Sequence, residues 1–323
     1  MSPSQSNEPL LAVQLGALAL RNPLLSASGT FGHGLEMQHF APPSTLGGLV
    51  SKTVTLRPRP GNPEPRIAET AAGFLNSIGL ENRGIDHYLE HTLPSMGAAD
   101  CAVVTNVGGE SIEDFVAVVE RLAGEERVDA LEVNLSCPNV QGGRLPFGTD
   151  PDNAAQVLRA LRAVTDKPLW AKLSPNVTRI GEMAQAVEAA GADAVTAVNT
   201  LLGMAVDWRS GRARVNTTVC GYSGPAIKPI ALRCAWECVN AVSIPVIGCG
   251  GIAGVDDVLE YLSVGCTAVQ VGTSSFSDPA LLGRLGDELA RSLAEAGFGS
   301  VGEGIGNLGA PQRELAAKSE GAH

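Results

Sequence analysis

Short apolar runs alternate with stretches of helical periodicity through most of this 323-residue chain. Such runs, rich in Val, Ile, Leu and Ala and bounded by Gly, Pro or Asn, are typical of buried parallel strands joined by helices. The predicted strands are Leu24–Ser28, Leu49–Thr53, Cys101–Asn106, Ala130–Asn134, Leu169–Leu173, Ala194–Asn199, Pro245–Cys249 and Ala268–Val271. Eight strand–helix units close a (β/α)8 barrel, so we predict a single α/β TIM barrel.

Segments outside these units add a hairpin and three long loops. Leu11–Leu15 and Leu18–Leu20 flank a Gly-Ala pair and predict an N-terminal β-hairpin that plugs the barrel bottom. Thr55–Asn76, Leu135–Asp150 and Leu201–Gly224 each follow the carboxyl end of a predicted strand. Because that end of a barrel is its active face, and long loops in compact domains are usually functional, we expect the active site there.

Composition narrows the class of partner. Lys and Arg number 23 against 34 Asp and Glu, a net charge of −11, and 44% of the residues are hydrophobic. An acidic balance without basic clusters argues against nucleic acid or an anionic membrane as the main partner. No apolar run resembles a membrane span or a signal peptide, so we expect a cytoplasmic protein. The barrel is expected to span residues 10–296, after a disordered N-terminus (1–9) and before a C-terminal tail (297–323) of no assigned role.

Glycines and polar residues at the predicted strand ends indicate a ligand. Gly248–Gly251 follows the seventh strand and Gly272-Thr273 the eighth, which are the loops that commonly bind phosphate in barrels. Polar side chains also end the other strands: Ser28, Lys52, Thr53, Asn106, Asn134, Lys172, Asn199 and Thr200. Carboxamides and lysines suit a flat, carbonyl-rich heterocycle and an anion.

One of the seven cysteines is a candidate for chemistry. Cys137 lies three residues past Asn134, on an active-face loop, where a thiol can act as nucleophile or general base. The other cysteines are expected to be reduced; core packing is expected for Cys101, Cys234, Cys238, Cys249 and Cys266, and Cys220 is undecided. His87 and His91 have a zinc-like spacing without a third ligand, so we expect a solvated helix face and no metal.

Ten short strings occur in the order in which one known family has them. They are Ser26–Gly32, Lys52-Thr53, Gly61–Arg66, Leu75–Leu80, Asn134–Val140, Lys172–Asn176, Val198–Thr200, Ser223–Ala226, Gly250-Gly251 and Gly272-Thr273. On these strings the chain resembles the class 1 dihydroorotate dehydrogenases, from about residue 10 to about residue 290. His33 and Cys220 depart from the pattern, where an aromatic residue and a glycine are expected.

The resemblance implies an FMN-dependent barrel that oxidises (S)-dihydroorotate to orotate in pyrimidine synthesis. FMN would be held by Ser28, Lys52, Thr53, Asn106, Asn134, Lys172, Val198 and Gly224, with its phosphate on Gly250, Gly251, Gly272 and Thr273. Dihydroorotate would contact Lys52, Asn76, Ser77, Ile78, Gly79, Leu80, Asn134, Asn139, Asn199 and Thr200. Cys137 would remove a proton from C5 while C6 gives a hydride to the flavin, and Lys172 would stabilise negative charge on the reduced flavin.

The resemblance also bears on the electron acceptor. Class 2 members use Ser as the base and carry an N-terminal extension, so Cys137 and the short N-terminus favour class 1. Gly73–Gly79 and Asn139–Gly143 resemble the NAD-linked class 1B type, whose partner subunit carries FAD and an iron–sulfur cluster. A homodimer, or a heterotetramer with that subunit, is implied. The chain has no dinucleotide GxGxxG motif after its first strand and no iron–sulfur cysteine pattern, so it needs a partner to reach NAD.

Three alternatives stay open. A fumarate-linked class 1A enzyme shares most of the strings. A dihydropyrimidine dehydrogenase-type flavin barrel uses a similar cysteine loop, although Lys52 and the Asn76–Leu80 segment suit the orotate carboxylate better. A barrel lyase or isomerase would hold a phosphorylated substrate at Gly250 and Gly272 without a flavin.

Overall fold

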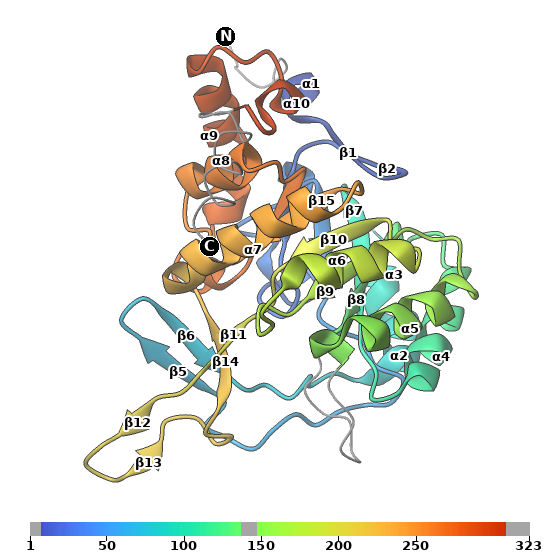
Figure 1. Cartoon of the computed structure of the whole chain (residues 1–323), viewed down its shortest axis with the longest axis vertical. Helices are drawn as coiled ribbons and strands as arrows, with labels where there is room; N and C mark the ends of the chain where they lie inside the picture. Colours follow the sequence, from blue (N-terminus) through green and yellow to red (C-terminus); the bar gives the residue numbers. More distant parts are fainter. Residues whose placement is uncertain (1–7, 98, 137–146, 308–323) are drawn as a thin grey trace.

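The structure, a computed structural model, describes residues 8–97, 99–136 and 147–307. Its centre is a closed barrel of parallel strands in the order β10-β15-β16-β3-β4-β7-β8-β9 (Figure 1). In chain order these are β3 (Leu24–Ser26), β4 (Gly48–Val50), β7 (Ala102–Val107), β8 (Ala130–Asn134), β9 (Leu169–Leu173), β10 (Ala194–Ala197), β15 (Val246–Cys249) and β16 (Ala268–Val271). Pairing of β16 with β3 closes the ring, and the predicted TIM barrel is confirmed.

The strand bounds differ from the prediction mainly at the mouth of the barrel. The ranges of β8, β9 and β16 agree with the sequence prediction. Strands β3, β4 and β10 end two or three residues earlier than predicted. Ser28, Thr53 and Asn199 therefore belong to the loops that leave the strands, where their side chains can face a ligand.

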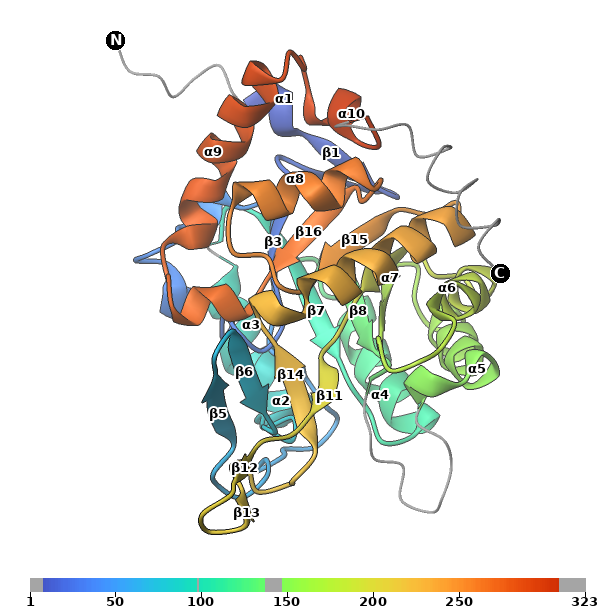
Figure 2. The ribbon, with the colours of Figure 1, turned by 60° about the vertical axis from the view of Figure 1, so that its left-hand side comes forward.

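Helices surround the barrel (Figures 1 and 2). They are α2 (Gly84–His87), the π-helical turn Tyr88–Thr92, α3 (Leu93–Met96), α4 (Ile112–Ala123), α5 (Pro151–Arg162), α6 (Ile180–Ala189), α7 (Lys228–Ala241), α8 (Val255–Ser263) and α9 (Leu281–Glu295). Short 3-10 turns cover Leu35–Met37, Pro43–Thr45, Phe147–Thr149, Pro225–Ile227 and Thr273–Phe276. Ser111 caps α4 by accepting a hydrogen bond from the Asp114 N–H (3.2 Å).

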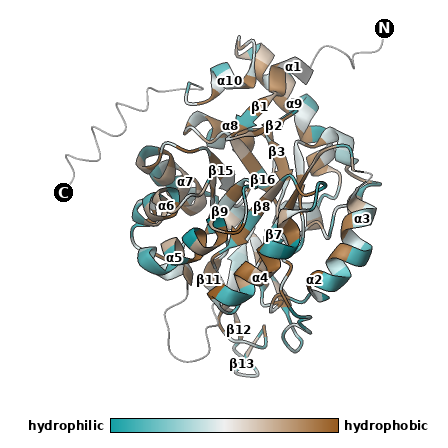
Figure 3. Ribbon diagram, turned by 90° about the vertical axis from the view of Figure 1, so that its right-hand side faces the viewer, coloured by the Kyte–Doolittle hydropathy of each residue, from teal (hydrophilic) through white to brown (hydrophobic). Residues whose placement is uncertain are grey.

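The main core lies between the strands and the helices. Helix α4 buries Phe115, Val118, Val119 and Leu122 against it, and strands β3 and β16 are among the hydrophobic, brown parts of the ribbon in Figure 3. The inside of the barrel is different, because it holds polar side chains without exposure, among them Glu132. These lie on the strand faces that point away from the helices.

The amino ends of the strands are closed by the predicted hairpin, β1 (Val13–Leu15) and β2 (Leu18–Leu20). Its Gly16 turn lies against Asp193, the residue before β10, so the hairpin covers the barrel bottom. The short helices α1 (Glu8–Leu11) and α10 (Val301–Gly304) contact each other at the same end (Figure 2). Residues 1–7 of the predicted disordered N-terminus and 308–323 of the tail lie outside the described residues.

A second, smaller sheet stands on the carboxyl side of the barrel (Figures 1 and 2). Its order is β11-β14-β6-β5, and it is built from β5 (Ile67–Thr70), β6 (Gly73–Asn76), β11 (Leu201–Gly203) and β14 (Cys220–Ser223). Two of the three segments that the sequence predicts as loops therefore contain strands. A separate two-stranded extension, β12 (Val206–Asp207) and β13 (Arg212–Ala213), lies between β11 and β14.

No helix in the described ranges is both long and apolar enough to cross a membrane.

Candidate active site

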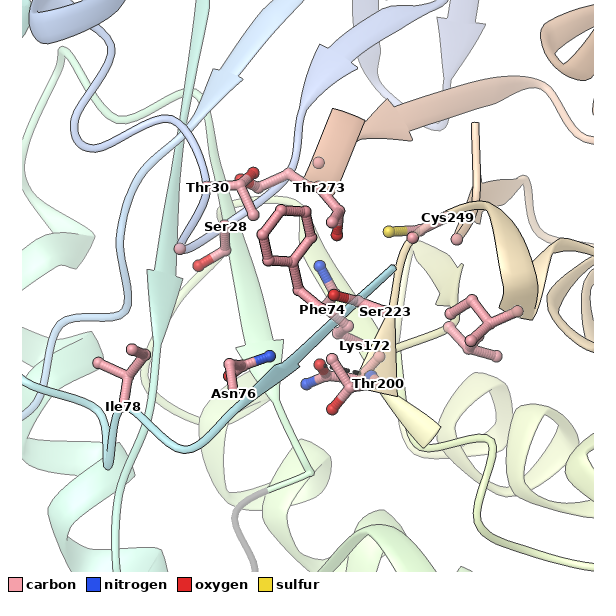
Figure 4. A pocket seen from close by; sticks show the side chains of 18 of the residues that line it. Ser28, Thr30, Phe74, Asn76, Ile78, Lys172, Thr200, Ser223, Cys249 and Thr273 are labelled. Carbon is pink, nitrogen blue, oxygen red and sulfur yellow. Dashed lines mark hydrogen bonds between the residues drawn. The ribbon is translucent and has the colours of Figure 1, made fainter. Parts of the chain in front are cut away.

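A cavity of about 380 Å³ opens at the carboxyl ends of the barrel strands. Every residue that the sequence assigns to FMN lines it: Ser28, Lys52, Thr53, Asn106, Asn134, Lys172, Val198, Gly224, Gly250, Gly251, Gly272 and Thr273. Figure 4 shows Ser28, Lys172 and Thr273 reaching this space from different elements. The cavity therefore lies at the predicted strand ends.

The residues predicted to bind substrate divide into three groups. Lys52, Asn76, Ile78, Leu80, Asn134, Asn199 and Thr200 line the cavity. Ser77 and Gly79 do not; the Ser77 hydroxyl instead accepts a hydrogen bond from the Asn62 amide (2.8 Å). This is because alternate residues of an extended segment point to opposite sides. Cys137 and Asn139 lie outside the described residues.

One end of the cavity is made by two glycine turns. Gly250 and Gly251 have φ values of 132° and 76°, and a Cβ on Gly251 would stand 2.6 Å from the Lys228 Cβ. A side chain is thus excluded, and backbone is presented to the cavity. The Ser274 hydroxyl donates to the Ile252 carbonyl (2.6 Å) and ties the loop after β15 to the loop after β16. The residues present fit an anionic group such as a phosphate.

The floor of the cavity is polar and fully buried. Lys172 is 4% exposed, and its ammonium donates to Gln270 Oε1 (2.8 Å) and to Glu132 Oε1 (3.5 Å). Burial is the largest single influence and lowers the pKa of Lys172, but attraction to the Glu132 carboxylate, the nearby Cys249 and the hydrogen bond to Glu132 together outweigh it, so the pKa lies above its ordinary value. Asn106 donates to Glu132 (2.7 Å) and accepts from the Thr53 hydroxyl (2.6 Å).

Sequence reasoning missed Glu132 and Gln270. Both lie in strands that otherwise read as apolar, Ala130–Asn134 and Ala268–Val271. A carboxylate or carboxamide in a fully buried strand is rare unless it is paired. Glu132 also shares its strand face with Asn134, which was singled out, so the alternation of β8 is the signal that could have found it.

Above the floor, one lysine and several carboxamides face the open space. Asn199 donates to Asn134 Oδ1 (3.3 Å), and Asn176 fixes the loop by donating to the Thr200 carbonyl (3.0 Å). No carboxylate in the described part of the chain forms an ion pair with Lys52. Its charge is therefore available to an anion in the cavity.

The mouth of the cavity is apolar, a feature that the sequence analysis did not predict. Phe74 of β6 and Phe276 contact each other with ring centroids 5.8 Å apart. Ile67 and Phe276 line the cavity while 50% and 53% exposed. A polar floor with an apolar mouth suits a flat heterocycle that carries an apolar edge.

The six described cysteines are free thiols, as expected. Cys234, Cys238 and Cys266 are buried in the main core, and Cys220 packs in the small core of the second sheet. Cys249 is buried but also lines the cavity, and Figure 4 shows its sulfur there. Burial raises the pKa of the Cys249 thiol, so it stays protonated near neutral pH.

The two histidines on the helical segment do not form a metal centre. The rings of His87 and His91 stack with centroids 4.6 Å apart, and His87 lies 2.9 Å from an Arg83 guanidinium nitrogen. Within residues 8–97, 99–136 and 147–307, no group of three His, Cys, Asp or Glu side chains is placed to hold a metal.

Together, the barrel, the glycine turns and the amide-rich floor form a cavity of the kind that suits an enzyme acting on a flat, polar heterocycle. Residues 10–293 match the family model described as dihydroorotate dehydrogenase. The chain belongs to the dihydroorotate dehydrogenase family, whose members are flavin-dependent oxidoreductases. The predicted family and enzyme class are confirmed.

Curated relatives agree with this assignment, and a solved structure has the same fold. The chain is 47% identical over 301 residues to "Dihydroorotate dehydrogenase B (NAD(+)), catalytic subunit" of Trichlorobacter lovleyi, covering 93% of this chain and 99% of the relative. It is also 47% identical over 297 residues to the protein of that name from Bacillus pumilus, covering 92% and 96%. A dihydroorotate dehydrogenase from Eimeria tenella, solved with ferulenol, shares the fold with a TM-score of 0.78 at 23% identity, covering 95% of this chain and 90% of that one.

Proposed function

We propose that the chain is the FMN-binding catalytic subunit of an NAD-linked dihydroorotate dehydrogenase that makes orotate for pyrimidine synthesis in the cytoplasm. The observation that carries this proposal is that one cavity contains all the FMN residues implied by the family resemblance together with most of the substrate residues. Membership of the family supports the reaction. The names of the curated relatives support the NAD-linked type.

The cofactor is FMN, because the cavity combines an anion site with a polar floor and an apolar mouth. The turns at Gly250-Gly251 and Gly272-Thr273 would hold the phosphate with backbone N–H groups. Asn106 and Lys172 would meet the polar edge of the isoalloxazine ring, while Phe276 lies on the apolar side. Bound FMN supplies the hydride acceptor of the reaction.

The protein's own residues bind and deprotonate the substrate. Lys52, without an ion-pair partner in the described structure, would neutralise the orotate carboxylate. The Asn134–Asn199 pair would fix the carbonyl and N–H groups of the ring, because amides can serve as both donor and acceptor. Cys137 would take the proton from C5; it follows, by three residues, Asn134, which lines the cavity.

Electrons leave the chain through a partner. The relatives are named as catalytic subunits of NAD-dependent enzymes, which supports a second subunit. We propose that this partner carries FAD and an iron–sulfur cluster, and that it assembles with a homodimer of this chain into a heterotetramer.

The test is dihydroorotate oxidation by the purified chain, with its absorption spectrum recorded first. We expect a flavin spectrum, reduction of the flavin by dihydroorotate, and NAD reduction only after the partner subunit is added. A colourless protein that does not take up FMN would remove the flavin assignment. Fumarate reduction by the chain alone would replace the NAD-linked type with the fumarate-linked one.

A further inference from the structure

The carboxylate of Glu132 lies beneath the cavity and has no solvent exposure. It accepts hydrogen bonds from four side chains on four different strands. Asn106 and Lys172 donate to Oε1, and Thr196 (3.0 Å) and Gln270 donate to Oε2. A carboxylate has about four lone-pair sites, so this one is fully satisfied.

This arrangement determines how the neighbouring amides are oriented. Only an N–H group can face a carboxylate, so Asn106 and Gln270 must each turn their nitrogen toward Glu132. The oxygen of Gln270 is then left to accept from Lys172 (2.8 Å), and that of Asn106 to accept from Thr53 (2.6 Å). One buried group thus sets the donor and acceptor pattern of the whole floor.

Lys172 depends on the same carboxylate for its charge. An isolated ammonium is strongly disfavoured at a site that is 4% exposed, and Glu132 is the carboxylate with which it pairs. Two of its three N–H groups point to Gln270 and Glu132, and the residue also lines the cavity. The third donor is therefore available to a ligand.

We propose that Glu132 is a positioning residue that keeps Lys172 ionised and directed at the cofactor, and so sets the reduction potential of the bound flavin. The proposal rests on the proposed FMN site. Glu132 itself does not line the cavity, so it acts through Lys172, Asn106 and Gln270. A positive charge held beside a flavin favours the reduced, anionic form and makes the potential more positive.

Replacement of the carboxylate by an amide has a defined consequence. In Glu132→Gln, the new N–H groups cannot face the existing donors, so Gln270 must turn its nitrogen toward Lys172. That orientation is satisfied only if Lys172 becomes a neutral amine that accepts the hydrogen bond. The variant therefore removes the positive charge next to the cofactor while the volume of the side chain is kept.

The experiment is a measurement of the two-electron midpoint potential of FMN in the purified chain by dye equilibration. We expect Glu132→Gln to lower the midpoint potential by about 30 mV or more. For a two-electron couple, about 30 mV corresponds to a tenfold change in the equilibrium constant for reduction. The double variant Glu132→Gln with Lys172→Met should have the same potential as Glu132→Gln alone, because both lack the charge. The matched control is Glu188→Gln, which loses a carboxylate that accepts from the exposed Ser243 hydroxyl (2.5 Å), far from the cavity, and should keep the wild-type potential.

A second variant keeps the proposal testable if Glu132→Gln does not fold. Gln270→Met retains both charges but removes the carboxamide that bridges them, and should lower the potential by a smaller amount. The proposal is overturned if Glu132→Gln has a potential at or above the wild-type value, or if Gln270→Met has an unchanged potential. In either case the wild type would still be a yellow, active enzyme, and the proposed function would stand. A wild type that binds no FMN removes the proposed function as well, so the two failures are distinguishable.

Discussion

At the scale of single residues, the cavity is defined by how its charges are compensated. Lys172 is buried and pairs with Glu132, whereas Lys52 is half-buried and pairs with no described carboxylate. The two lysines therefore have different tasks. A compensated charge organises the floor, and an uncompensated one attracts an anionic ligand.

Replacement of Lys52 by Met tests the second task. We expect kcat/KM for dihydroorotate to fall about 10- to 100-fold, because a hydrogen bond to a charged group contributes about 1.5–3 kcal/mol. Steady-state kinetics with an artificial acceptor measures it. Lys167→Met is the control. Lys167 lies just before β9, away from the cavity, and its ammonium donates to the Glu125 and Val128 carbonyls (2.9 and 2.8 Å). The KM of this variant for dihydroorotate should therefore stay unchanged.

Cys137 as the general base makes a prediction about pH. Cys137→Ala should lose about 10²–10⁴-fold in kcat, the usual contribution of a general base. Cys137→Ser should keep weak activity that rises with pH, because a hydroxyl becomes a competent base only as the solution becomes more alkaline. Stopped-flow reduction of the flavin across a pH series measures both variants.

Cys101→Ser is the matched control for that series. Burial raises the pKa of Cys101 to about 11, so its thiol is not a base near neutral pH and the variant should react like the wild type. Wild-type rates in Cys137→Ser at pH 7 would contradict the assignment of the base.

Residues at the cavity could be predicted where the signal is local. Strand-end amides and lysines such as Asn134 and Lys172 stand out in the sequence because a polar residue follows an apolar run. Glu132 did not stand out, because its role depends on Thr196 and Gln270, which lie 64 and 138 residues away. The place of Cys249 in the cavity wall could not be predicted either, because it depends on where strand β15 ends and not on the residue type.

At the scale of elements, the second sheet determines the shape of the cavity mouth. Strand β6 carries Phe74 and Asn76 into the cavity and pairs with β14, whose Ser223 also lines it. The sheet has its own small core of Ala68, Leu75, Val215 and Cys220. The position of Asn76 therefore depends on packing outside the barrel.

Leu75→Ala tests this dependence. The residue is 2% exposed, and truncation of such a side chain costs about 2–5 kcal/mol where the site cannot collapse. We expect faster hydrogen exchange in β6 and β14 and a raised KM for dihydroorotate, with little change in FMN retention. Leu202→Ala, in the same sheet but 65% exposed, should behave like the wild type; an equal effect in both would contradict a role for the small core.

The barrel strands could be predicted and the second sheet could not, for one physical reason. A buried barrel strand is a continuous apolar run such as Leu169–Leu173, readable within a few residues. Strands β6 and β14 are short, and the pairing that joins them brings together residues as distant along the chain as Phe74 and Ser223. Nothing in either loop alone distinguishes four residues of strand from an irregular segment.

At the scale of the whole molecule, the cavity proposed to bind FMN joins parts of the chain from Ser28 to Thr273. A ligand that touches so many strand ends binds the folded chain and not the unfolded one. Ligand binding and global stability are therefore linked.

We expect FMN at about 100 times its Kd to stabilise the chain by about 2.7 kcal/mol, or roughly 4 °C in Tm. Riboflavin is the matched control ligand, because it has the same ring system without the phosphate. Thermal denaturation of flavin-free protein with each ligand measures the difference. Equal shifts with FMN and riboflavin would contradict the assignment of the Gly250 and Gly272 turns to the phosphate.

The pairing of two loops side by side in the second sheet has a consequence for proteolysis. Strands β11 and β14 belong to one loop, β5 and β6 to the other, and the exposed tip between β12 and β13 carries Trp208, which is 76% exposed. A protease that cuts at this tip separates β11 from β14 along the chain, but β14 stays hydrogen-bonded to β6 and to β11. The two fragments should therefore remain together as a nicked, still folded protein until denaturant separates them.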